Sequence, residues 1–136
     1  MGRETIRRDI TAAVKAAVED LYPAMIVEYD NRIVVDTGSA QEPFLTCNIR
    51  FIDSEQREIA PDAATRYMGQ IELAVAVKEG QGVSDAYKII DALNPRLQRK
   101  ALGTVRTYTA QAVRDKPHLG WIYYPTLIPF WSDQPS

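Results

Sequence analysis

The stretch TRYMGQIELAVAVKEGQGVSDAYKIIDAL, residues 65–93, changes its hydrophobic period in the middle. Before Gly80, apolar and polar side chains alternate, which is the pattern of a strand with one buried face. The apolar face carries Tyr67, Ile71, Leu73, Val75 and Val77, and the polar face carries Arg66, Gln70, Glu72 and Lys78. The stretch therefore predicts a long strand over residues 65–79 at the centre of a sheet.

After Gly82 the apolar side chains recur every three or four positions, as on one face of an amphipathic helix. The residues on this face are Ala86, Ile89, Ile90, Leu93 and Leu97. Ser84 is a favourable N-cap residue, and Asn94–Pro95 should end or kink the helix. A strand followed by a helix is thus predicted, joined through Gly80-Gln81-Gly82.

The rest of the chain supplies one more helix and several strands. The predicted elements are a helix over 4–21 that Pro23 ends, a short strand in 25–31, a brief extended segment at 32–36, a loop at 36–43, a strand over 44–52, a mobile polar loop at 53–64, a strand over 101–113, a turn at 115–120, and a last strand over 121–131. Pro125 and Pro129 place that last strand at a sheet edge or interrupt it, and residues 132–136 should fray. We expect a single α+β domain over 1–136, with about five mostly antiparallel strands and two flanking helices in the order α-β-β-β-α-β-β.

Composition excludes several classes of protein. The chain has 136 residues, of which 46% are hydrophobic and 25% charged, as in a globular domain. A net charge of −2 without a basic run is poorly suited to binding nucleic acid. No run approaches the ~20 apolar residues of a membrane helix, and the N-terminus lacks the core of a signal peptide, so we expect a cytoplasmic chain. The single Cys47 excludes an internal disulfide.

The candidate chemical motifs fail on their spacing. The glycines at 80 and 82 suggest a dinucleotide turn, but Asp85 stands where the third glycine belongs, so a plain strand-to-helix connection is favoured. Cys47 lies on the apolar face of its strand, and His118 is the only histidine. The acidic stretch from Asp53 lacks the glycine and glutamate that a calcium loop requires. We expect no enzymatic activity, no cofactor and no metal.

The last predicted strand carries large aromatic residues at both parities. They are Trp121, Tyr123, Tyr124, Phe130 and Trp131. Because alternate residues of a strand point to opposite faces, both faces of the sheet would be apolar there. Two explanations remain open. Either a second apolar face meets another subunit or partner, or the two helices cover much of both faces.

Taken in order, these pieces resemble the phage tail terminator-like proteins, a family similar to the minor tail protein U of lambda-type phages. The matching pieces are the N-terminal helix, "IVEYDN", "FLTCNIRFI" with its acidic loop, the arginine–x–x–glycine strand with its glycine turn and helix, and the closing "GWIYYPTLIPFW". The chain departs from the family in the tyrosine before its Asp-Asn turn and in the Asn94–Pro95 that shortens the second helix. The resemblance covers nearly the whole chain.

The resemblance implies a structural role in a virion. Such proteins form a hexameric ring at the head-proximal end of the tail tube, stop its polymerisation and offer a surface to neck proteins. The partners would be further copies of the chain, the tail tube protein and a head-completion or neck protein, and the location would be the virion tail, reached from the cytoplasm of a bacterial host. Candidate interface residues are charged and aromatic ones of the loops and the strand ends beside them, Asp53, Glu55, Arg57, Glu58, Arg66, Arg114, Lys116 and Trp131. The competing hypothesis is a small ligand-binding or regulatory protein, a monomer or dimer, that uses a cleft between sheet and helix.

Overall fold

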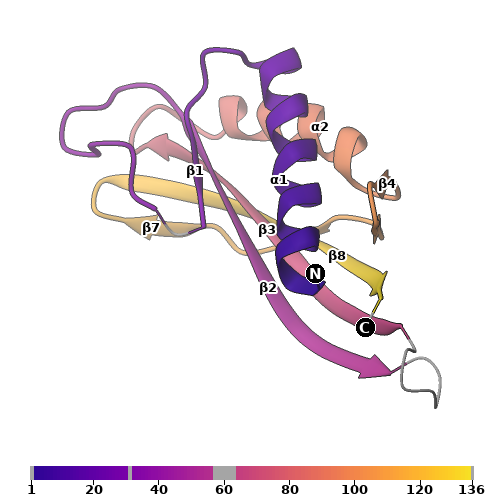
Figure 1. Ribbon diagram of the computed structural model, residues 1–136. Helices are drawn as coiled ribbons and strands as arrows, with labels where there is room; N and C mark the ends of the chain where they lie inside the picture. Colours follow the sequence, from indigo (N-terminus) through magenta and orange to yellow (C-terminus); the bar gives the residue numbers. More distant parts are fainter. Residues whose placement is uncertain (1, 31, 57–63, 136) are drawn as a thin grey trace.

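The computed structural model describes residues 2–30, 32–56 and 64–135, which form two helices and an eight-stranded sheet. The helices are α1 (Gly2–Leu21) and α2 (Ser84–Leu97), and the strands are β1 (Val27–Tyr29), β2 (Phe44–Gln56), β3 (Thr65–Lys78), β4 (Ala101–Leu102), β5 (Val105–Thr107), β6 (Gln111–Ala112), β7 (Lys116–His118) and β8 (Trp121–Gln134). The main path of the sheet is β1-β2-β3-β8-β5-β4, with β6 and β7 also paired to β8 (Figure 1). The predicted α+β class is confirmed, but the sheet is mixed, because β1 pairs with β2 in parallel, and it has more strands than the five expected.

The core lies between the helices and one face of the sheet, which we call the helix face. Ile71, Leu73, Val75 and Val77 of β3 are each at most 2% exposed. They pack with the apolar stripes of both helices, namely Ile6, Ile10, Val14, Ala17 and Val18 of α1 and Ala86, Ile89, Leu93 and Leu97 of α2. The alternation and the helical spacing in the sequence therefore predicted this core correctly.

Gly69 is the one position of β3 where the helix face has no room for a side chain. It lies opposite Phe51 of β2 and Phe130 of β8. A Cβ at this position would lie 2.7 Å from Cζ of Phe130 and closer still to the carbonyl oxygen of Arg50. The glycine of the arginine–x–x–glycine pattern thus lets an aromatic ring cross the strand.

Strand β8 is an inner strand, so its prediction as an edge or interrupted strand was wrong. It pairs with β3 along its whole length and with β5, β6 and β7 on its other flank. The N–H and C=O of one residue point to the same flank of a strand. The carbonyl of Pro129 accepts from Tyr108 (2.9 Å) on the β5 flank, and Pro125, four residues away, faces the same flank. Both prolines fall in gaps between the short pairings there, so their missing N–H groups interrupt no ladder.

The predicted loop over 53–64 is shorter than expected. Strand β2 continues to Gln56 and β3 begins at Thr65, with a β-bulge between Phe51 and Asp53. Polar residues are compatible with a strand here because one side of the sheet carries no helix. Residues 57–63 of the predicted loop, with the mobility expected of them, lie outside the described residues.

Several further predictions about local structure were wrong in part. Helix α2 begins at Ser84, as expected, but Val83 holds the cap position without a side-chain hydrogen bond. Pro95 does not end α2, which continues to the buried Leu97. The predicted strand over 101–113 divides into β4, β5 and β6: Gly103, at a φ of 60°, turns the chain between β4 and β5, and residues 108–110 separate β5 from β6. The predicted turn at 115–120 contains β7, so the chain turns only at its last two residues, 119 and 120. Residues 32–36, expected to be a brief extended segment, belong to no strand.

The C-terminal segment is ordered at least to Gln134, against the expectation that it frays. Ser132 is fully buried and Gln134 is 2% exposed. The Gln134 side-chain amide donates to the hydroxyls of Ser132 (2.7 Å) and Thr104 (2.9 Å). A tertiary hydrogen-bond network, which local sequence does not reveal, holds this end of the chain.

Candidate functional site

The face of the sheet opposite the helices, called the open face here, is mostly polar along its middle. Its cross-strand rows are Thr46–Ala74–Pro125, Asn48–Glu72–Leu127 and Arg50–Gln70–Pro129, from β2, β3 and β8. Arg50 and Glu72 form an ion pair of 3.2 Å in which Arg50 is largely exposed. Such a pair adds little stability. This face is therefore available for contacts with other molecules.

One end of the open face is closed by the chain itself. Val35, Phe44, Ala76 and Trp121 form a small second core there. The Trp121 indole donates to the carbonyl of Thr37 (3.0 Å), and its ring meets that of Phe44 edge to face at 5.1 Å. Aromatic residues of β8 occupy both faces of the sheet, as predicted. Trp121 lies in this second core on the open face, and Phe130 lies in the main core on the helix face. A loop before β2, rather than a helix, covers Trp121.

A groove of about 570 Å³ runs along the middle of the open face. Its floor is the polar rows, and its wall is the segment from Val113 to His118. Lys116 lies in β7, opposite Tyr123, and is exposed, as is Arg114 two residues before it. The predicted interface residues Arg114 and Lys116 thus lie on or beside this wall.

Three more of the predicted interface residues, Asp53, Arg66 and Trp131, lie at the far end of the open face. There β2, β3 and β8 extend beyond the helices as an arm (Figure 1). Arg66 donates two hydrogen bonds to the Asp133 carboxylate (2.7 and 2.9 Å), and its guanidinium lies 4.1 Å from the ring centre of Trp131. Bidentate geometry and a cation–π contact together fix the Arg66 side chain. Asp53 lies opposite Met68, which in turn lies opposite Trp131.

The structure therefore divides the predicted interface into two groups. Asp53, Arg66 and Trp131 belong to the arm, where the backbone of Glu55 also lies opposite Arg66. Arg114 and Lys116 belong to the groove wall. Arg57 and Glu58 lie outside the described residues. The sequence analysis missed Asp133 because it fell in the segment expected to fray.

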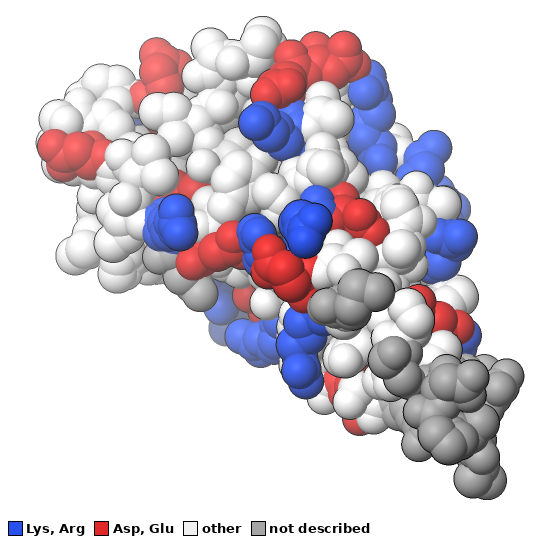
Figure 2. All heavy atoms as spheres, viewed as in Figure 1, with Lys and Arg blue, Asp and Glu red and all other residues white. Residues whose placement is uncertain are grey.

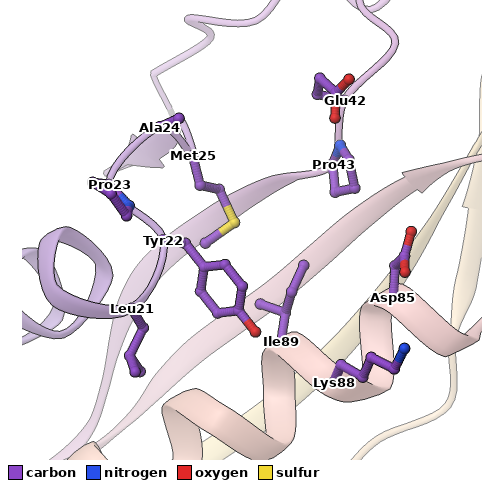
Figure 3. A pocket seen from close by; sticks show the side chains of 10 residues that line it. All are labelled: Leu21, Tyr22, Pro23, Ala24, Met25, Glu42, Pro43, Asp85, Lys88 and Ile89. Atoms are coloured by element: carbon purple, nitrogen blue, oxygen red, sulfur yellow. The ribbon is translucent and has the colours of Figure 1, made fainter.

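A second hollow, the helix pocket, lies between the end of α1 and the start of α2. Its volume is about 570 Å³. Figure 3 shows the side chains of Tyr22, Met25 and Ile89 gathered on one side of it, and the carboxylates of Glu42 and Asp85 on another. The pocket is therefore apolar with an acidic rim, to which Lys88 adds one positive charge.

Cys47 and the glycines at 80 and 82 lie apart from these two hollows, whereas His118 lines the groove. Burial raises the pKa of the Cys47 thiol to about 12, so the thiolate form is suppressed at neutral pH. Gly80 and Gly82 have φ values of 92° and 85° and form the predicted connection to α2. Within residues 2–30, 32–56 and 64–135, no three His, Cys, Asp or Glu side chains are grouped to hold a metal. No helix in the described part of the chain has the length and apolarity to cross a membrane.

Comparisons with known proteins show a shared fold. No family model matches the chain, and no curated protein matches it. A chain from the virion of a native gene transfer agent particle matches with a TM-score of 0.51 and 14% identity, covering 92% of this chain and 98% of the other. A further solved protein, whose name states no function, matches with a TM-score of 0.71 and 16% identity, covering 98% and 96%. At these identities the likeness establishes the fold alone.

Proposed function

We propose that this protein is a phage or prophage tail terminator or completion protein, which caps the tail tube, stops its polymerisation and provides a surface for joining the head. The observation that carries the proposal is the fold shared, over nearly the full length of both chains, with a component of the gene transfer agent virion. The order of the sequence pieces that resemble the tail terminator family supports the same role. In this role the protein has no catalytic site and needs no cofactor.

The distribution of surface groups supports assembly into a closed ring. Each subunit of a ring must present two different patches to its two neighbours. We assign these two roles to the arm, with Arg66 and Trp131, and to the groove wall, with Arg114 and Lys116, which differ in composition. Figure 2 shows acidic and basic side chains interspersed on the face it views, without a field of one sign. Such surfaces suit weak polar contacts that form when the tail tube provides a template.

The ring would place this protein between two partners. One of its rims would meet the last ring of the tail tube protein, and the other would meet a head-completion or neck protein. The chain would reach this place in the virion tail from the cytoplasm of the bacterial host. No nucleic acid or membrane contact is part of this proposal.

Electron microscopy of particles made with and without the gene tests the proposal. Without the protein we expect overlong tails or tails without heads. Arg114→Glu should give the same defect while the purified variant melts like the parent chain, because Arg114 is exposed. Lys15→Glu, a charge reversal on the exposed side of α1, is the matched control and should give normal particles. Normal tails joined to heads in the absence of the protein would refute the proposal.

The helix pocket favours a second candidate, a ligand-binding or regulatory protein that acts as a monomer or dimer. The pocket is large enough for a small molecule and lies between the two helices. The two candidates differ in their response to tail tubes. A terminator should change from a small species to a multimer bound at tube ends in sedimentation experiments, whereas a ligand-binding protein should not change in size.

A further inference from the structure

One edge of the sheet is a long strand that lacks a neighbour along most of its length. β1 pairs with β2 only from Leu45 to Cys47, and within the described residues no strand pairs with β2 beyond that point on this side. The sequence that follows, NIRFI, is rich in residues that favour strand pairing. The opposite edge, β4, has only two residues and offers little backbone to pair. The edge of β2 is therefore the one where a strand of another chain could add.

The hydrogen bonds to the segment around β1 show which backbone groups of β2 point outward from this edge. The N–H of Leu45 and the carbonyl of Cys47 both bond to that segment (3.0 and 3.1 Å), so both residues face outward. Residues of a strand point to its two flanks alternately, and the N–H and C=O of one residue share a flank. Ile49 and Phe51 therefore also face outward, and they present the groups that an added strand would use.

Two features interrupt this edge directly after Phe51. The β-bulge between Phe51 and Asp53 inserts Ile52, which has no partner on β3 and is 60% exposed. The extra residue bends the strand and breaks the regular spacing of the outward groups. It also shifts the alternation by one position, so that Ser54 faces outward. The N–H of Ser54 donates to the carboxylate of Asp53 (2.8 Å), so a donor that an added strand would need is already bonded.

We propose that the Ile52 bulge and the Asp53 carboxylate block the edge of β2, so that β2 of one copy of this chain does not pair with β2 of another. Two identical edges can pair antiparallel about a twofold axis, which gives a dimer or a nucleus for aggregation. In such a pair, an Asp53 carboxylate from each copy would lie at the same interface. This role differs from the subunit contact that the sequence suggested for Asp53. It concerns the free subunit and is independent of the proposed function.

Opening the edge should make the purified full-length chain associate. Deleting Ile52 restores regular pairing with β3, and Asp53→Thr removes the charge and releases the N–H of Ser54. In sedimentation equilibrium without other proteins, the chain with both changes, called the opened chain, should self-associate about tenfold or more strongly than the parent, because each backbone bond gained forms twice in a symmetric pair. Asp91→Thr, which removes the same charge from the exposed side of α2, is the matched control and should behave like the parent. If the opened chain associates no more than Asp91→Thr, the proposal is wrong.

A proline at an outward position tests whether β2 is the surface that pairs. In the opened chain, Ser54→Pro removes the outward N–H, while the groups that bond to β3 belong to the residues on either side of it. Association should return to the parent level, and the melting temperature should stay close to that of the opened chain. Ser54→Thr keeps the N–H and should leave the association of the opened chain unchanged. Equal association of the two Ser54 variants would place the contact elsewhere and overturn the proposal.

Asp53→Thr alone provides the test if the deletion of Ile52 prevents folding. This substitution leaves the pairing of β2 with β3 in place and should strengthen self-association about threefold or more, since one donor per chain is released. Association equal to that of Asp91→Thr would refute the role of the carboxylate. Because these measurements use the purified chain alone, association of the opened chain supports the blocked edge even if particles made without the gene have normal tails.

Discussion

Replacing Gly69 by alanine is expected to destabilise the protein far more than an ordinary glycine substitution. The new methyl group would lie 2.7 Å from Cζ of Phe130 and would also meet the carbonyl oxygen of Arg50, which belongs to the backbone of the paired strand β2. Neither neighbour is the free end of a flexible side chain. Overpacking of this kind costs about 1–3 kcal/mol, and alanine regains less than about 1 kcal/mol through the unfolded chain.

The backbone clash places the expected loss at the upper end, about 2–3 kcal/mol in the free energy of unfolding. For a chain of 136 residues, the unfolding entropy near the melting point is about 0.3 kcal/mol per kelvin. The melting temperature should therefore fall by about 7–10 °C, measured by circular dichroism or calorimetry. Gly38→Ala is the matched control, because its Cβ would have only an ordinary contact of 3.4 Å with Asp36 Oδ1. If Gly69→Ala melts within 2 °C of Gly38→Ala, roughly the error of such a comparison, the argument from crowding is wrong.

Three further predictions follow from burial and charge. Leu73→Asp places an unpaired charge in the core and should abolish folding, whereas Glu72→Lys on the open face should lower the free energy of unfolding by less than about 1 kcal/mol. If both substitutions lowered the melting temperature equally, the description of β3 as having one buried and one open face would be wrong. Because burial raises the pKa of Cys47 to about 12, thiol reagents at pH 8 should modify it only after denaturant unfolds the chain, and rapid labelling of the folded protein would show that the thiol is accessible. Arg66→Ala should expose the indole of Trp131 and shift its fluorescence to longer wavelength while costing only about 1 kcal/mol, since the ion pair is partly exposed; an unchanged spectrum would argue against the stacked arrangement.

The sequence was informative wherever one local pattern determines the structure. The alternation around Leu73 predicted both faces of the central strand, and the spacing around Leu93 predicted the buried side of α2. These patterns follow from the geometry of a single element and need no knowledge of its neighbours.

The sequence was misleading where the structure of a segment depends on other segments that pack against it. Whether Pro125 breaks a ladder depends on what lies opposite its nitrogen, and that is set by the distant segment between β6 and β7. Gln134 is ordered by Thr104, thirty residues away in the chain. The division of the candidate interface residues between the arm and the groove wall likewise depends on how the strands are arranged in the sheet. The spacing of residues within one segment does not predict that arrangement.

The two prolines of β8 also have a consequence for dynamics. Because they divide the flank of β8 into separate short pairings, the segment from β5 to β7 is not joined to the sheet by one cooperative ladder. It can open in steps while β2, β3 and β8 stay paired along their length. Native-state hydrogen exchange should show this as amides near Gln111 and Lys116 that exchange through small local openings, well before those of β3. A hairpin attached in this way could adjust its position on meeting a neighbour without disturbing the core.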